Sequence, residues 1–305
     1  MRNKAILALW VLFSIALVCI YLTIGSPGTN IITQVRIPRL LLTLFTGMAL
    51  AGIGSIYQVM LANPLAEPYI LGISSGSAFG SILAGVTGFV ILMPLGGFAG
   101  AGLTMLLVWK LAHQKGRFDK SRLLISGVIA GMFFAAGISL LMYLHLKDTA
   151  LILGTLMGNL GRIFSTGEWL TFSILLAVSM LILAYLYFKS TAIDILSNGD
   201  IYAGSLGINV LKLRREVFLL TSIVIGICVA YAGIIGFVGL IIPHVVRFFV
   251  PSGQRRIYLL SLWSGAIFLL ACDMAAKHLL AIELPVGIIT AFLGCPFFMW
   301  LLLRK

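Results

Sequence analysis

Long runs of apolar residues constrain this chain more than any other feature. The first run, Ala5–Ile24, is long enough to cross a bilayer, which takes about 20 mostly apolar residues, and similar runs follow along the chain. We expect spans at residues 5–24, 39–61, 69–90, 92–112, 123–144, 168–188, 216–233, 235–250, 257–276 and 285–303. These runs predict an all-α, polytopic membrane helix bundle of about ten transmembrane helices.

The composition agrees with a lipid environment. Of the 305 residues, 61% are hydrophobic and only 10% are charged, whereas about 25% are charged in an ordinary soluble domain. One soluble core of this size would not hide so much apolar surface, because a folded protein still exposes much of its surface to water. A soluble enzyme, a disordered chain and a secreted disulfide scaffold are therefore excluded.

The basic residues predict the orientation. The net charge of +12 would suggest nucleic acid in a soluble protein, but basic residues of membrane proteins gather in cytoplasmic loops. If the N-terminus lies inside and the chain crosses ten times, 16 of the 21 basic residues fall inside. The remaining five fall outside, namely Arg36, Arg39, Lys147, Arg162 and Lys277. We therefore predict that both termini are cytoplasmic and that nucleic acid is no partner.

Two segments fit no span. Leu151–Phe164 is short, apolar and glycine-rich, and we expect a short outer or re-entrant helix there, because a non-spanning segment must be buried in protein or face water. The longest inside loop, about 189–215, is too short for a domain and predicts one or two short helices under the membrane. The whole chain, 1–305, is thus expected to form a single transmembrane domain.

Small residues four apart predict close helix packing. Gly76 and Gly80 have this spacing, and so do Gly96 and Gly100. Glycines in this register let transmembrane helices approach closely. The same explanation covers the G-x-S-x-G letters at 72–76, because a hydrolase nucleophile would need a strand-to-helix turn and triad partners.

No catalytic or metal site is indicated. The four histidines and four cysteines lack the spacing of metal ligands or of a disulfide framework. The chain also lacks the G-x-x-x-x-G-K-[ST] phosphate loop. We therefore expect that the chain is no enzyme and binds no cofactor, and that any ATP-Mg would bind a partner subunit.

Charged residues near the outer side have two interpretations each. Asp273 lies near the end of the ninth span, and Lys277 follows at the i,i+4 spacing of a helical ion pair. Intramembrane acids can also mark ion pathways. Arg36 and Arg39 flank Pro38 on the outer side, against the inside bias. Either an acidic partner or substrate contacts these two arginines, or they anchor the chain to lipid headgroups.

Seven short motifs occur together in this sequence. They are R-I-P-R at 36–39, N-P-L-A-E-P at 63–68, L-G-I-S-S-G at 71–76, G-F-V-G-L-I-I-P-H at 236–244, L-A-C-D at 270–273, E-L-P-V-G at 283–287 and L-G-C-P at 293–296. In this order and spacing the chain resembles the FecCD-type permeases of bacterial ABC importers, which move ferric siderophores, haem and cobalamin. The resemblance runs from about residue 33 to the C-terminus.

The resemblance implies an assembly in the bacterial inner, or plasma, membrane. Two permease copies, here expected to be a homodimer, pair around a central pathway. Two ATPase subunits bind on the cytoplasmic side and hold the ATP-Mg, and a substrate-binding protein docks outside. The family's docking cations correspond by position to Arg36, Arg39 and Lys277.

The resemblance also implies cytoplasmic functional residues. Residues 199–207 are similar to the family's coupling pattern G-[DE]-x-x-A-x-x-L-G, which assigns the ATPase contact to Asp200, Ala203, Leu206 and Gly207. The family's cytoplasmic gate lies in the loop between the fourth and fifth spans, at Lys120 and Ser121 in this sequence.

The expected function is therefore that of a permease subunit of an ATP-driven importer, with ferric siderophores as the leading cargo. Haem and cobalamin are alternatives within the same architecture. An ion-coupled secondary transporter is the alternative from another class, and it would need inverted repeats and midplane ion ligands.

Overall fold

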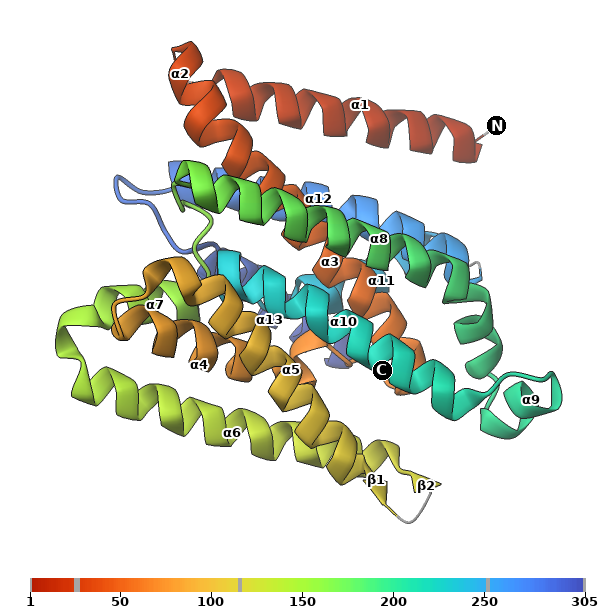
Figure 1. The fold of residues 1–305 in the computed structure, drawn as a ribbon. Coiled ribbons are helices and arrows are strands. Elements are labelled where there is room, and N and C mark those ends of the chain that lie inside the picture. The colour runs from red at the N-terminus through yellow and green to blue at the C-terminus, as the bar shows by residue number, and fades with distance from the viewer. Residues whose placement is uncertain (1, 25–27, 115–116, 251–252, 304–305) are drawn as a thin grey trace.

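The computed structural model describes residues 2–24, 28–114, 117–250 and 253–303, and it is almost entirely helical (Figure 1). A helix lies in each region where a span was predicted. These helices are α1 (Arg2–Thr23), α3 (Ile37–Met60), α4 (Ile73–Val86), α5 (Met93–Ala112), α6 (Lys120–Leu144), α8 (Thr166–Leu196), α10 (Val210–Ala232), α11 (Val238–Phe249), α12 (Gln254–His278) and α13 (Val286–Leu303).

The predicted all-α class is confirmed. Six helical segments in the described part of the chain are long and apolar enough to cross a membrane, among them Thr29–Met60 and Gly167–Leu196. Four further apolar helices are shorter, with 10–17 residues. The number of crossings and the side on which each terminus lies stay predictions from the sequence.

Short elements connect the long helices. They are α2 (Thr29–Ile31), a π-helical turn (Ile32–Arg36), 3-10 turns at Pro68–Leu71, Val90–Leu92 and Leu146–Asp148, α7 (Thr149–Met157), α9 (Asp200–Ser205), and a ribbon of the two-residue strands β1 (His113–Gln114) and β2 (Arg117–Phe118). The ribbon is antiparallel, with His113 opposite Phe118.

Two predicted boundaries need correction. The predicted short outer helix at 151–164 is helical only as α7, which begins at Thr149 and ends at Met157. The predicted inside loop at 189–215 is narrower, because α8 continues to Leu196 and α10 already begins at Val210. The continuous apolar run ends at Lys189, but the helix goes on as a mixed segment that buries Ile193 and Leu196, so hydropathy alone placed the helix end too early.

Helix α3 lies at the centre of the bundle, with most of its side chains buried. Gly47 of α3 and Gly265 of α12 face each other so closely that a methyl group on either would collide with the backbone of the other. Gly54 of α3 approaches the backbone of Gly239 in α11 in the same way. The absence of side chains at these positions lets both helices pack directly against α3.

The predicted glycine packing is confirmed between α4 and α5. A methyl group on Gly80 would meet the carbonyl of Gly96, and one on Gly100 would meet the carbonyl of Gly76. The sequence spacing of four residues therefore corresponds to one continuous line of backbone contact between the two helices.

The bundle has two distinct ends. In Figure 1, α2, α7 and the loop after α12 lie at the left, whereas α9 and the β1–β2 ribbon lie at the right. Following the charge-based orientation, we name the left end the outer end and the right end the cytoplasmic end.

Candidate functional site

A buried ion pair occupies the outer end between α3 and α12. Arg39 donates from Nε to one Asp273 oxygen at 3.0 Å and from a terminal nitrogen to the other at 2.5 Å. Asp273 is 0% exposed and Arg39 is 6% exposed. A bidentate guanidinium–carboxylate pair of this kind fixes both orientation and distance, so it ties the two helices together.

Three more side chains surround this pair. Lys277 lies 3.8 Å from Asp273, which confirms the predicted i,i+4 ion pair. The Lys277 ammonium also donates to the Tyr21 hydroxyl at 3.0 Å, and that hydroxyl donates to Asp273 at 2.9 Å. Glu283, in the loop after α12, forms a second ion pair with Arg39, and its side chain is 48% exposed.

Arg36 reaches a different set of partners. Its guanidinium donates to the backbone carbonyls of Tyr21, Leu22 and Ile24, at 3.2, 2.9 and 2.6 Å. These carbonyls belong to the C-terminal end of α1, where a helix leaves its last carbonyls without helical partners. Arg36 therefore caps the C-terminal end of α1. All three of these hydrogen bonds go to backbone carbonyls, and none pairs the arginine with a carboxylate.

The structure thus brings the three predicted docking cations, Arg36, Arg39 and Lys277, to one end of the bundle. We name them, with Tyr21, Asp273 and Glu283, the outer charge cluster. Arg39 is largely enclosed, whereas Arg36 and Lys277 are partly exposed. The sequence predicted the three cations but assigned no role to Glu283. The ion pair between Glu283 and Arg39 is apparent only in the folded structure.

The cytoplasmic end carries the short helix α9. Its flanking glycines adopt positive φ angles, +110° at Gly199 and +80° at Gly207, which residues with a side chain rarely adopt. After α9 the Ile208 amide donates to the Ala203 carbonyl at 3.1 Å, and the Gly207 amide donates to Gly204 at 3.0 Å. Bonds of this pattern end a helix at a left-handed glycine.

The predicted coupling residues have unlike environments. Ala203 is fully buried, whereas Leu206 is 55% exposed. Two residues of α9 outside the predicted coupling set, Ile201 and Tyr202, are 92% and 51% exposed. Together Ile201, Tyr202 and Leu206 form an apolar surface on α9 and its C-cap, which we name the α9 surface.

Asp200 attaches α9 to α10. Both of its oxygens accept hydrogen bonds from Arg214, each at 2.7 Å. These bonds, with the nearby charge of Lys120, lower the pKa of Asp200 below its ordinary value. Arg214 is only 2% exposed, although it lies at the cytoplasmic end.

The two predicted gate residues lie at the start of α6. The Asp119 carboxylate caps this helix by accepting from the amide of Ser121 at 2.8 Å, and Ser121 itself is exposed. The β1–β2 ribbon precedes them directly. Arg214, which binds Asp200, also lies over the ring of Phe118, two residues before Lys120, so the predicted gate and coupling segments are neighbours.

The N-P-L-A-E-P motif at 63–68 forms a turn that also contacts the start of α11. The Asn63 side chain accepts from the Leu65 amide at 2.9 Å, a bond that asparagine commonly makes in turns. The Glu67 carboxylate, in addition, accepts from the Phe237 amide at 2.5 Å, at the entry to α11. The turn therefore also fixes where α11 begins.

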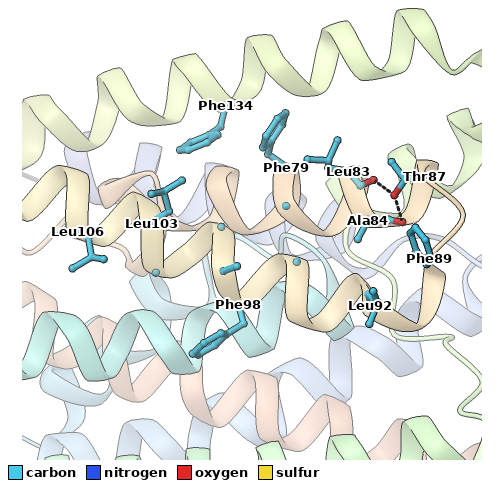
Figure 2. A pocket seen from close by; sticks show the side chains of 15 residues that line it. Phe79, Leu83, Ala84, Thr87, Phe89, Leu92, Phe98, Leu103, Leu106 and Phe134 are labelled. Atoms are coloured by element: carbon cyan, nitrogen blue, oxygen red, sulfur yellow. Dashed lines mark hydrogen bonds between the residues drawn. The ribbon is translucent and has the colours of Figure 1, made fainter.

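A groove of about 980 Å³ lies between α4, α5 and α6. Figure 2 shows its wall of apolar side chains, including Phe79, Phe98 and Phe134. The Thr87 hydroxyl already donates to the Leu83 and Ala84 carbonyls, and no lining side chain is charged. Nor do three or more potential metal ligands meet anywhere in the described ranges.

These features define a class of protein. A helix bundle with six segments long and apolar enough to cross a membrane, in the part of the chain that the structure describes, has the organisation of a polytopic membrane protein. The chain belongs to the FecCD transport family, whose pattern it matches over residues 5–304.

Curated relatives match this chain over most of their own length and at similar identity. A vitamin B12 import system permease protein, BtuC of Klebsiella pneumoniae, is 35% identical, over 92% of this chain and 85% of its own. A hemin transport system permease protein, HmuU of Yersinia pestis, is 34% identical, over 93% and 87%. A Helicobacter pylori protein described as a probable iron chelatin transport system permease is 36% identical, over 90% and 82%.

A solved structure has the same fold. It is described as an inward-facing conformation of a metal-chelate type ABC transporter, and it aligns with a TM-score of 0.89. The two chains are 30% identical, and the match covers 99% of this chain and 100% of the other. The family resemblance noted in the sequence is confirmed.

The class of function follows from the family. The chain is the permease subunit of an ABC importer, a transport subunit rather than an enzyme, and a multi-pass protein of the inner membrane. The ion-coupled secondary transporter that was considered from the sequence is not favoured by this family assignment.

Proposed function

We propose that this permease carries ferric siderophores inward, driven by ATP hydrolysis on separate subunits. The iron chelatin relative supports an iron complex as cargo, and the metal-chelate structure supports a chelated metal more generally. Haem and cobalamin stay alternatives, because the haem and vitamin B12 relatives are about as similar, at 34% and 35% identity.

The proposed assembly contains two copies of the chain, two ATPase subunits that hold ATP-Mg, and an external binding protein. Each copy contributes a single transmembrane domain over residues 1–305 and binds no cofactor itself. Binding and hydrolysis of ATP would switch the paired bundles between outward and inward openings, with Lys120 and Ser121 at the cytoplasmic gate. A second copy is expected because the family pathway lies between two bundles.

The α9 surface is the observation that carries this proposal. A side chain as exposed as Ile201, at 92%, is costly in water unless a partner covers it. The predicted coupling residues form and position this helix; they are Asp200, Ala203, Leu206 and Gly207. They therefore support the ATPase contact through the conformation of α9 as well as through direct contact. An apolar helix of this kind fits a groove on a partner subunit.

The outer charge cluster supports docking of a binding protein with acidic groups. Arg36, Arg39 and Lys277 bring three positive charges, and Asp273 and Glu283 bring two negative charges, which leaves the cluster with a net charge of +1. Charges at a rim steer an oppositely charged partner into register. We assign direct contact with the binding protein to Arg36 and Lys277. Arg39 is buried, so it would act on the binding protein through Glu283.

Purification of the tagged chain from membranes of its native host tests the proposal. We expect an ATPase subunit to co-purify, and the binding protein retained by the complex to hold an iron–siderophore complex, identified by mass spectrometry and absorption. Bound haem or a corrinoid would overturn the siderophore assignment. Absence of any ATPase would overturn the proposed assembly.

A further inference from the structure

We propose that Arg214 is a positioning residue that links the ATPase-contact helix α9 to the gate segment at the start of α6. The inference rests on the proposed function, because it concerns how movement at α9 reaches the gate. Arg214 belongs to neither the predicted coupling residues nor the predicted gate residues, and the inference connects these two segments through it.

On one side Arg214 binds α9. Its two terminal nitrogens each donate to one oxygen of Asp200 at 2.7 Å, the first residue of α9. The Asp200 side chain is 47% exposed, but the Arg214 side chain is only 3% exposed. The charge of the arginine is therefore enclosed in protein, and Asp200 is the carboxylate that balances it in these contacts.

On the other side Arg214 contacts the segment that leads into α6. Its guanidinium carbon lies 4.8 Å from the centre of the Phe118 ring. Phe118 belongs to strand β2, two residues before Lys120. A guanidinium over an aromatic face is an attractive contact that strengthens when water is excluded.

The Phe118 ring is itself held in an aromatic cluster. It lies 5.4 Å from the Trp109 ring of α5 and 6.5 Å from the Phe218 ring of α10. Phe218 in turn lies 5.3 Å from the Tyr57 ring, near the cytoplasmic end of α3. Phe118 is thus connected by ring contacts to helices that form the interior of the bundle.

Arginine suits this position better than lysine. Its planar fork binds a carboxylate through two bonds while its face lies on an aromatic ring, whereas an ammonium is a point charge. The Arg214 Nε is buried and has no hydrogen-bond partner in the described part of the chain. The two terminal nitrogens are bound by Asp200 and the guanidinium carbon lies over the Phe118 ring, so the unpaired Nε is the one part of the group that neither partner uses in these contacts.

The link constrains how α9 can move. Separating Asp200 from Arg214 would leave a buried charge without its partner, which is strongly unfavourable. Displacement of α9 by an ATPase subunit therefore carries the guanidinium along, and with it the Phe118 ring. Since Phe118, Lys120 and Ser121 lie within four residues of each other, the gate segment follows.

Cysteine accessibility at Ser121 tests the link in inside-out vesicles of the native host. The parent variant carries Ser121→Cys, with Cys19 and Cys295 replaced by alanine. Its labelling rate by a membrane-impermeant maleimide is measured without nucleotide and after trapping with ATP-Mg and vanadate. We expect trapping to change the rate about fivefold or more, within the range of ordinary allosteric coupling.

Arg214→Lys and Phe118→Leu are each added to this parent, and Arg215→Lys serves as the matched control because Arg215 is the exposed neighbour on α10. We expect both test variants to bring the ratio of the two labelling rates to about one, while the ATPase still co-purifies with the folded permease. The control keeps the full response.

A full response in both Arg214→Lys and Phe118→Leu would overturn the inference while leaving the proposed function intact. Loss of the response in Arg215→Lys as well would also overturn it, because the effect would then not belong to Arg214. A parent that shows no response to nucleotide, or retains no ATPase, would instead overturn the proposed function on which the inference rests.

Discussion

Arg39 and Asp273, which are 234 residues apart in the sequence, form a bidentate ion pair between α3 and α12 in the interior of the protein. The same two helices meet at Gly47 and Gly265, where their backbones are in contact. One contact is polar and specific, and the other depends on the absence of side chains. Together they fix how α12 lies along the central helix.

Asp273→Asn should destabilise the protein strongly. The substitution leaves Arg39 and Lys277 beside a neutral group, and breaking a buried pair from one side costs about 3–5 kcal/mol. The melting temperature of the purified complex measures this loss. Glu283→Gln is the matched control, and because its side chain is 48% exposed, a loss of about 1 kcal/mol or less is expected. Equal losses in the two variants would contradict the central role of Asp273.

Arg36→Glu and Lys277→Glu should weaken docking of the binding protein. Each reverses a partly exposed charge at the outer end, and rim charges act mainly on the association rate. We expect slower association that is less sensitive to salt, measured by surface plasmon resonance with the complex in nanodiscs. Arg162→Glu is unsuitable as a control because Arg162 pairs with Glu168 at 2.6 Å, so Lys147→Glu is used. An unchanged association rate in both variants would argue against docking at the cluster.

Gly80→Ala should destabilise the packing of α4 against α5. The added methyl group would collide with the Gly96 carbonyl, and overpacking of a close interface costs about 1–3 kcal/mol. Gly102→Ala, on α5, is the control, because a methyl group there meets no atom within 4 Å. Thermal unfolding of the two variants checks the prediction, and a Gly102→Ala protein as unstable as Gly80→Ala would contradict it.

The attachment of α9 should be insensitive to pH over the physiological range. The pKa of Asp200 is lowered in the folded protein by its bonds to Arg214. A lowered carboxyl pKa contributes stability that is complete above the ordinary value of 3.8 and is lost as the pH falls through the folded value. Hydrogen exchange of residues 200–206, corrected for intrinsic rates, should therefore be flat from about pH 5 to pH 8. Asp200→Asn should raise the exchange at every pH in this range.

The helical regions were predictable because a span is a local property of the sequence. Twenty apolar residues in a row and a glycine every fourth position report directly on helix length and on close packing. Helix ends were less predictable, as α8 shows, because polar residues such as Lys189 and Thr191 end the apolar run while the helix itself continues to Leu196.

The sites were predictable only as separate motifs. Arg36, Arg39 and Lys277 could be grouped by side and by family resemblance, but no local pattern pairs Arg39 with Asp273 or with Glu283. Arg214 looked like one of several inside cations that determine orientation. Its burial, and its contacts with Asp200 and Phe118, depend on three segments that meet only in the folded bundle.

ATP-dependent uptake in proteoliposomes tests the central claim most directly, with the permease complex purified from its native host and a radiolabelled ferric siderophore delivered by the binding protein. We predict uptake that requires ATP-Mg on the ATPase side. Ile201→Asp, which places a charge on the 92% exposed position of the α9 surface, should abolish uptake and ATPase association together. Uptake that persists without ATP, or an Ile201→Asp complex that assembles and transports normally, would contradict the account.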